Sequence, residues 1–435
     1  MMKKVMIGIA FIMAVLMLSF ATDSEAMTKK TKEYRYDVNE NGDVEIIKYT
    51  GKKKKVTVPA RIDGKDVVFV EGFRYTHVTN VTIPDSVMSI GDSAFEGCKK
   101  LKKVKLSKKI TTIPWDAFRN CDSLTTVNMS GNISKIGYYA FQNCGELLSV
   151  GDLTLKEIEW NAFENCKKLA GTITLDSSIE NIPDYCFYHC KKLDFRIPDK
   201  DWKVGEFAFA GCPKISKRYL SPDVSADAYA GCANIDTVIV KDDNVVEENG
   251  IYYSKDKKTL IYVRPDYSGT LDFLKQVETI GAYAFSGFRQ KKVKIPDNIR
   301  EIKEGAFYGA KCKSVTWNKK VKDIADNMFR ESALEKVVIP KGVKTIGCRA
   351  LWDMAKCVSV SLSASVQSWA DYAPGDDFTT GVLEGFPVLK KVTVASGNPL
   401  FKSKKGLLFS KTNRLLCYPA GRKAKSYKIP KCIRV

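Results

Sequence analysis

The stretch IPDSVMSIGDSAFEGCKKLKKVKL, residues 83–106, contains the pattern on which the fold depends. Its aromatic residue, Phe95, has counterparts along the chain roughly every 22 residues, apart from one longer gap. The aligned positions are Phe95, Phe118, Phe141, Phe163, Phe187, Phe209, Tyr229, Phe285, Phe307, Phe329 and Leu351. Such regular repetition predicts a solenoid, in which each repeat packs mainly against its two neighbours.

Each repeat carries a strand signal and a turn signal. The alternation Val104-Lys105-Leu106 is typical of a strand with one buried face, and it returns in most copies. Two residues after the aromatic the chain has mostly Gly or Asn, as at Gly97 and Asn120, which adopt the left-handed conformation cheaply. We therefore expect parallel stacked strands, and short helical turns that end in a left-handed cap. Glu331 and Asp353 depart from this rule, which leaves open a different cap there.

The skeleton resembles the BspA-like class of bacterial leucine-rich repeats, whose pattern is close to IPxxVxxIgxxAFxxCxxLxxVxL. Residues 83–106 match it at nearly every defining position, and the resemblance covers about residues 33–435. The expected fold class is α/β: a curved right-handed leucine-rich-repeat solenoid with a parallel β-sheet on one face, short helical turns and β-hairpin insertions. The resemblance also implies a cell-surface or secreted binding role, commonly adhesion to host glycoproteins or to other cells.

Three segments interrupt the repeats. Apolar runs around polar turns predict β-hairpins at 34–50, 249–265 and 405–421, and the first of them is expected to cap the open edge of the solenoid. YKIPKCIRV (427–435) stops where a new repeat would begin, so either the native chain continues or its last edge pairs with another molecule. The expected organisation is a signal peptide at 1–26, an N-terminal hairpin cap with a first partial repeat at 27–80, a first repeat block at 81–240, a hairpin insertion at 241–276, a second repeat block at 277–400, and a second hairpin with the start of a further repeat at 401–435.

The N-terminus and the charge indicate export and an acidic partner. Two lysines, an apolar run over 5–21 and a small-x-small pattern at 24–26 are typical of a secretory signal peptide, with an uncleaved anchor as the alternative. The net charge of +20 favours an extracellular protein or glycoprotein, possibly an acidic one, or a cell-wall polyanion. A lysine-rich soluble surface with no specific partner is the alternative. We expect no nucleic acid as a specific partner and no transmembrane segment in the mature chain.

Seven of the 13 cysteines occupy one repeat position. They are Cys98, Cys121, Cys144, Cys166, Cys190, Cys212 and Cys232. Equivalent residues in a parallel stack lie ~4.8 Å apart and point the same way, whereas a disulfide needs the two Cβ atoms to turn toward each other. We therefore expect a ladder of buried free thiols, with disulfides between neighbours as the alternative. Cys348, Cys417 and Cys432 fall at turns or hairpins, where exposed thiols are expected.

The sequence offers no constellation for catalysis. With only two histidines and no nucleophile elbow, a Ser-His-Asp or Cys-His site is not expected. His189 falls at the cap position, where His is tolerated, and the neighbouring Cys186 and Cys190 lack the second half of a zinc site. We therefore expect no catalytic residue, no cofactor, no metal and no enzymatic activity.

Polar residues between the buried strand positions are expected to face outward along the sheet, where solenoids usually bind extended partners. The candidate binding residues are Lys103, Lys105, Asn128, Thr174, Arg196, Lys292, Lys294, Thr316 and Lys336. A sheet face that only contacts water is the alternative, and the four lysines at 52–55 leave open a polyanion contact or a solvated turn.

Taken together, these features predict an exported, non-enzymatic leucine-rich-repeat binding protein. The expected role is that of a cell-surface adhesin that recognises host or neighbouring-cell macromolecules through its solenoid surface. The alternative is a structural or cell-wall/glycan attachment module that carries or presents another domain.

Overall fold

The structure is a computed structural model, and the chain forms two compact units, Met1–Ile179 (unit 1) and Glu180–Val435 (unit 2). The residues that the structure describes are 28–129, 132–151, 153–171, 173–193, 202–372 and 383–422. The predicted signal peptide, the candidate binding residue Arg196 and Cys432 lie outside the described residues.

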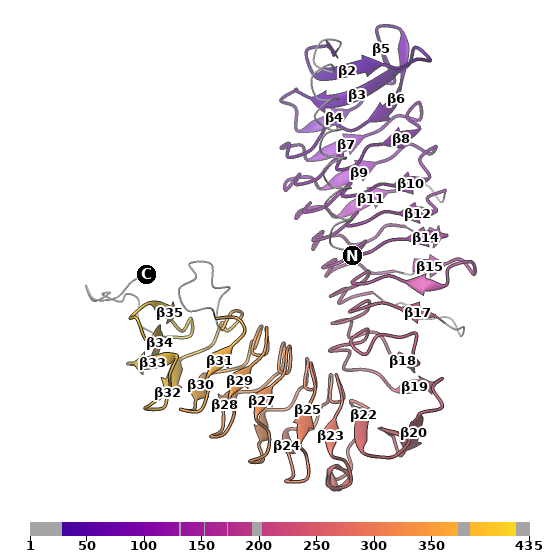
Figure 1. Ribbon diagram of the computed structural model, residues 1–435. Coiled ribbons are helices and arrows are strands. Elements are labelled where there is room, and N and C mark those ends of the chain that lie inside the picture. Colours follow the sequence, from indigo (N-terminus) through magenta and orange to yellow (C-terminus); the bar gives the residue numbers. More distant parts are fainter. Residues whose placement is uncertain are drawn as a thin grey trace, which may run out of the picture. The chain divides into compact units, whose positions relative to one another are not determined.

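The described residues of unit 1 form fifteen short strands, many of which are labelled in Figure 1. Their bounds are β1 Lys29–Lys30, β2 Tyr34–Val38, β3 Val44–Tyr49, β4 Lys55–Thr57, β5 Arg61–Ile62, β6 Lys65–Val70, β7 Asn80–Thr82, β8 Ser89–Ile90, β9 Lys103–Lys105, β10 Thr112–Ile113, β11 Thr126–Asn128, β12 Lys135–Ile136, β13 Leu153–Leu155, β14 Glu157–Ile158 and β15 Ile173–Leu175. β2 and β3 form an antiparallel hairpin, and β3 continues in parallel to β6. The hairpin thereby covers the first open edge of this ladder.

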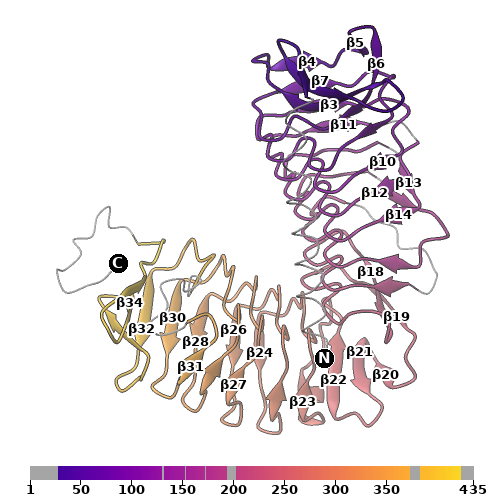
Figure 2. The same ribbon diagram turned by 45° about the horizontal axis from the view of Figure 1, so that its top comes forward.

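Unit 2 contains the remaining strands and a short 3₁₀ helix (Figure 2). Their bounds are β16 Asn181–Ile182, β17 Lys203–Val204, β18 Lys217–Leu220, β19 Thr237–Val240, β20 Val245–Glu248, β21 Ile251–Ser254, β22 Thr259–Val263, η1 Asp272–Lys275, β23 Thr279–Ile280, β24 Lys292–Lys294, β25 Glu301–Ile302, β26 Ser314–Thr316, β27 Asp323–Ile324, β28 Lys336–Val338, β29 Thr345–Ile346, β30 Ser359–Leu362, β31 Ser368–Trp369, β32 Lys391–Val394, β33 Phe401–Lys404, β34 Leu407–Ser410 and β35 Leu415–Cys417. β21 with β22 and β34 with β35 are antiparallel hairpins.

Most repeats contribute two short strands to two separate parallel ladders. In unit 1 the first ladder has the order β11-β9-β7-β4 and the second has the order β10-β12-β14. The alternating Val-Lys-Leu pattern predicted the first ladder, and the observed strands begin one residue earlier than that pattern. Strands of the second ladder, such as β10, are only two residues long. They are too short to show a period of two in the sequence, and they were not predicted.

The predicted short helical turns are not confirmed, because the chain between the two ladders hydrogen-bonds to the next repeat. The Phe95 N–H donates to the Ala117 carbonyl of the following repeat at 2.8 Å, while the intervening Glu96 N–H donates locally to Ser93 at 2.9 Å. An α-helix needs every N–H to bond within its own segment. The fold is therefore a β-solenoid of repeats with almost no helix, and the α/β class is not confirmed.

The sole helix among the described residues is η1, Asp272–Lys275. No helix in the described part of the chain has the length and apolar character that a membrane crossing would need.

The core lies between the two ladders and is organised around stacked aromatic rings. In unit 1 the Phe118 ring lies 5.1 Å from Phe95 and 5.2 Å from Phe141, with the planes nearly parallel. In unit 2 Phe307 stacks in the same way between Phe285 and Phe329. The repeated aromatic position therefore forms a continuous column of ring contacts in each of these blocks, and each ring is completely buried.

The seven repeat cysteines are buried thiols that are not joined in disulfides, as the predicted thiol ladder requires. The structure adds a hydrogen bond that the sequence did not reveal. Cys98 Sγ donates to the Phe73 carbonyl at 2.9 Å, and Cys121 Sγ donates to the Phe95 carbonyl at 3.1 Å. Each thiol thus joins its own turn to the preceding repeat, and burial raises the pKa of Cys232 to about 12. Cys348 is exposed and Cys417 is half-buried.

Candidate functional sites

The predicted binding residues that the structure describes all lie on short strands of parallel sheets, and all are exposed. They are Lys103 and Lys105 on β9, Asn128 on β11, Thr174 on β15, Lys292 and Lys294 on β24, Thr316 on β26, and Lys336 on β28. Between them the apolar strand residues, such as Val104 and Val293, point into the core. The pleat therefore presents these polar side chains on the outer sheet face of their unit.

Strand register brings three of these residues together in unit 1. Lys103 is paired with Asn80 and Thr126, and Lys105 is paired with Thr82 and Asn128. Pairing of β4 with β7 extends the two rows. The rows run Lys55–Asn80–Lys103–Thr126 and Thr57–Thr82–Lys105–Asn128. Lys55 is therefore part of the sheet face and not of the turn predicted for residues 52–55.

Unit 2 presents similar rows on two groups of strands. The pairs are Lys292 with Ser314, Lys294 with Thr316, Lys336 with Ser359, and Ser359 with Lys391. Lys391 is exposed but was not among the predicted residues. The alternation Lys391-Val392-Thr393 could have identified it by the rule that identified Lys336.

The positive charges of the lysines in these rows are available to a ligand. Within the described part of the chain, none of the five predicted sheet-face lysines forms an ion pair with an acidic side chain, whereas Lys313, just before β26, pairs with Glu335 at 2.6 Å. Rows of ammonium, hydroxyl and amide groups at the ~4.8 Å strand spacing can donate hydrogen bonds to an extended acidic or polar ligand. Their chemistry suits binding and provides no activated nucleophile.

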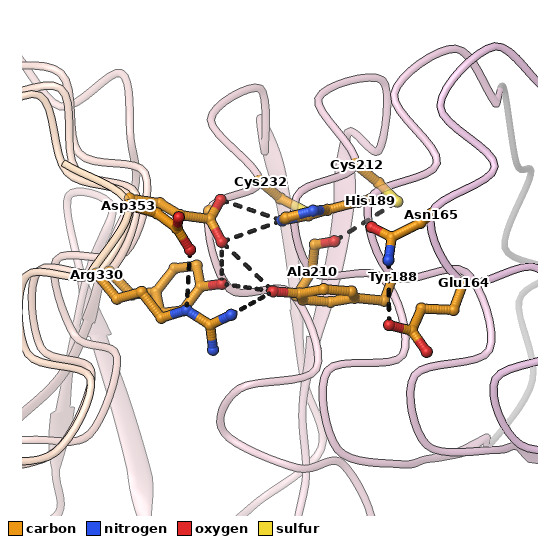
Figure 3. A network of polar contacts seen from close by, with 12 residues as sticks. Glu164, Asn165, Tyr188, His189, Ala210, Cys212, Cys232, Arg330 and Asp353 are labelled. Atoms are coloured by element: carbon orange, nitrogen blue, oxygen red, sulfur yellow. Dashed lines mark hydrogen bonds and ion pairs between the residues drawn. The ribbon is translucent and has the colours of Figure 1, made fainter. Parts of the chain in front are cut away.

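A second arrangement, in unit 2, involves the cap residues that depart from Gly and Asn (Figure 3). His189, Glu331 and Asp353 have φ of 59°, 59° and 55°, so all three adopt the left-handed conformation of the ordinary caps. The sequence therefore predicted the conformation at His189 correctly, and the different cap left open for Glu331 and Asp353 does not occur. What differs is the side chain that each of them projects.

His189 and Glu331 contact each other although they are 142 residues apart. His189 Nε2 lies 3.0 and 3.1 Å from the two carboxylate oxygens of Glu331. Tyr308 donates its hydroxyl to the same carboxylate, and Arg330 donates to the Tyr188 hydroxyl at 3.0 Å. We call these five residues the histidine–glutamate network. Sequence reasoning missed the network, although the titratable side chains at the cap positions 189 and 331 were its signal.

Aromatic packing holds the network in place. The Tyr188 and His189 rings stack with centroids 4.0 Å apart, and the Arg330 guanidinium lies 5.7 Å from the centre of the Tyr308 ring. Tyr308 is completely buried and Tyr188 is nearly so. Burial by itself would raise the pKa of Glu331, but the hydrogen bonds from His189 and Tyr308 and the charge of Arg330 lower it to about 2. The network therefore keeps the Glu331 carboxylate charged, and its role is to stabilise the fold.

Acid is expected to weaken unit 2 through Glu331. An unfolded glutamate has a pKa of about 4.3, so the depressed folded value stabilises the chain above that pH, and this stabilisation is lost as the pH falls toward 2. The loss is on the order of 2–3 kcal/mol. Urea unfolding of the full chain at about pH 5 and about pH 2.5, on either side of the unfolded value, measures it, and Glu331→Gln is expected to be the less acid-sensitive protein.

Glu335→Gln is the control for this experiment, because Glu335 forms an exposed ion pair with Lys313 in the same unit. It is expected to leave the acid dependence of the wild-type chain unchanged. Equal acid sensitivity of the wild type and Glu331→Gln would contradict the role given to Glu331.

Unit 2 also contains a cavity of about 610 Å³. It is lined by Glu180, Trp202, Lys203, Tyr219, Ser221, Pro222, Asp223, Val224 and Lys241. None of the predicted binding residues in the described ranges lines it. Nor do the described residues contain a group of three His, Cys, Asp or Glu side chains that could hold a metal ion.

Comparisons with known proteins point to one family. The family model for the BspA type leucine rich repeat region matches six copies, over residues 70–151, 151–257 and 268–375. No curated protein matches the chain significantly.

Solved structures of bacterial leucine-rich-repeat proteins are similar to the chain. A leucine rich cell surface protein from Faecalibacterium prausnitzii is 21% identical over 85% of this chain and 95% of that one, with a TM-score of 0.48. The leucine rich repeat protein of T. pallidum is 32% identical over 43% of this chain and 90% of that one, with a TM-score of 0.40. The pneumococcal vaccine antigen PcpA is 18% identical over 93% and 92%, with a TM-score of 0.34.

Proposed function

Because the chain belongs to the family of BspA-type leucine-rich-repeat proteins, we propose that it is a non-catalytic binding protein of the cell surface or the extracellular medium. Its sheet faces recognise an extracellular protein or glycoprotein of a host or a neighbouring cell, in the manner of an adhesin. Family membership supports the binding role, and the basic composition supports an acidic partner.

The observation that carries this proposal is the row of exposed, unpaired lysines in register with hydroxyl and amide groups. In unit 1, Lys103 and Lys105 are separated from their neighbours by a single strand step and are held by a parallel ladder on both sides. A ligand that follows the ladder meets the same polar groups at each step, so the face suits an extended partner. Positive charge then speeds the encounter and orients an acidic partner, and salt screens this attraction.

Charge reversal on this face is expected to weaken ligand capture. Lys103→Glu combined with Lys105→Glu replaces two positive charges with two negative ones in the centre of the sheet of unit 1. Immobilised full-length protein is incubated with host-cell, matrix and cell-wall extracts at low and high salt. The variant is expected to retain clearly less of the wild-type ligand at low salt and to show a weaker dependence on salt.

A matched control variant changes the net charge by the same amount as Lys103→Glu with Lys105→Glu does. Lys99 and Lys100 are exposed in the turn before β9, away from the strand face. Lys99→Glu with Lys100→Glu is expected to bind as the wild type does. Equal losses in both double variants, or wild-type binding to every polyanion with collapse in salt, would contradict specific recognition by the sheet face. Capture of cell-wall polymer alone would favour the alternative role of an attachment module.

A further inference from the structure

Unit 1 presents three aromatic side chains on its surface at one position of successive repeats. Trp115, Tyr138 and Trp160 each follow the paired isoleucine of the second ladder by two residues, after β10, β12 and β14. These strands pair in parallel and in register, so the three residues lie one strand step apart. Their exposed fractions are 53%, 40% and 51%. We call them the aromatic column.

The aromatic column is unusual for this chain. Aromatic side chains of the repeats are otherwise mostly core residues, and these three are among only nine large apolar side chains that are exposed in the described residues. Isolated exposed apolar residues are common, but a contiguous group marks a binding surface. At the same position of the preceding repeat the chain has Asp92, which is exposed and acidic. The column therefore has a polar boundary on that side.

The backbone carbonyls of the column already accept hydrogen bonds from the preceding repeats. The Trp115 carbonyl accepts from Ser93 at 2.8 Å, the Tyr138 carbonyl accepts from Asp116, and the Trp160 carbonyl accepts from Tyr139 at 3.1 Å. A peptide that adds as a strand needs free backbone donors and acceptors at a sheet edge. Recognition at this column therefore depends on side chains.

Polar groups of both kinds lie beside the rings. Lys135, on β12, forms ion pairs with Glu157 and, at 3.6 Å, with Glu159. The charge of Glu159 also raises the pKa of the Tyr138 hydroxyl, which places that carboxylate beside the ring. The surroundings thus hold two carboxylates for one ammonium, and Asp92 adds a third negative charge. This local charge is opposite to that of the lysine rows and disfavours a polyanion.

The spacing of the rings suits an extended chain of sugar rings. Trp115 and Trp160 are two strand steps apart, which is about 10 Å along the ladder and comparable with two pyranose units of an extended glycan. The Tyr138 and Trp160 rings meet edge to face, with centroids 5.9 Å apart. The two rings therefore do not cover each other in a face-to-face stack. A sugar ring presents C–H groups that pack on the electron-rich face of an aromatic ring, and hydroxyl groups that both donate and accept hydrogen bonds.

We propose that the aromatic column binds a neutral, extended polysaccharide. Sugar faces pack on Trp115 and Trp160, and sugar hydroxyls exchange hydrogen bonds with Lys135, Glu157 and Glu159. This site lies on a different ladder from the lysine rows and takes a ligand of a different charge. It therefore goes beyond the proposed sheet-face function and is independent of it.

The test is binding of the full chain to a microarray of neutral and acidic polysaccharides, followed by titration of the neutral ligand found there. Trp115→Ala and Trp160→Ala are each expected to weaken that binding roughly tenfold or more, and the double variant to abolish it. Because both side chains are exposed, circular dichroism should show an unchanged fold.

Two controls separate the outcomes. Met88, which is 60% exposed in the same unit, provides a non-aromatic substitution, and Met88→Ala is expected to bind normally. The Lys103→Glu, Lys105→Glu variant is also expected to keep neutral-glycan binding, so failure of one site is distinguishable from failure of the other. Binding only to acidic glycans, no binding to any neutral glycan, or full binding by the double tryptophan variant would overturn the proposal.

Discussion

Replacing Phe118 with alanine is expected to lower the free energy of unfolding of unit 1 by about 3–5 kcal/mol. The ring is completely buried and stacks on Phe95 and Phe141 at 5.1 and 5.2 Å, so its removal leaves a cavity that both neighbouring repeats line. Each repeat depends on its neighbours, and the loss should therefore spread to the flanking turns. Hydrogen exchange measured by mass spectrometry on the full chain should show faster exchange in these repeats.

Trp115→Ala is the matched control for Phe118→Ala, because it removes a larger aromatic side chain from the same repeat at an exposed position. Its effect on stability is expected to stay within about 0.5 kcal/mol. The same variant thus serves as the stability control here and as the binding variant for the aromatic column. If the two substitutions were equally destabilising, the stacked rings would not be the main support of the core.

Gly309→Ala is expected to destabilise unit 2 by about 2–5 kcal/mol, through two additive causes. Gly309 has φ of 62°, a left-handed conformation that costs other residues about 1–2 kcal/mol. A Cβ placed there would also lie 2.6 Å from the Cα of Gly231, so two backbone segments would have to separate. Because Tyr308 is the preceding residue, this separation should also weaken its contact with Glu331.

Comparison with Gly231→Ala separates the effect of the backbone clash from that of the left-handed conformation. Gly231 has φ of 73°, so alanine is strained there to a similar extent, but the nearest atom to an added Cβ is a Tyr308 ring carbon at 3.5 Å. Chemical denaturation of the two variants should therefore place Gly309→Ala clearly below Gly231→Ala in stability. Equal effects would mean that conformational strain alone accounts for both glycines.

The sequence predicted the features that repeat and missed those that depend on contacts between distant repeats. The strand around Val104, the buried cysteine column and the left-handed position at Asn120 each follow from a local pattern that recurs in most copies. The choice between a helical turn and a β-turn at Phe95 could not be read locally, because it depends on the N–H bond to Ala117 in the following repeat.

The candidate sites divide in the same way. Outward-facing lysines such as Lys105 followed from strand alternation, and the structure places them on the expected face. Trp115, Tyr138 and Trp160 were visibly aligned in the sequence, but they lie beyond a strand of two residues, and no periodicity indicated that they face solvent. The contact between His189 and Glu331 has no local signature beyond the unusual residue at each cap.

That contact changes how unit 2 can open. In a simple linear array a repeat can detach from one end while the rest stays folded, because no repeat is tied to a distant one. The link between His189 and Glu331 closes a loop of 142 residues. The repeat that contains His189 therefore depends on the distant repeat that contains Glu331. Repeats inside that loop cannot peel away one by one without first breaking the link. Unit 2 therefore combines local stacking with contacts between distant repeats, which favours collective over sequential unfolding.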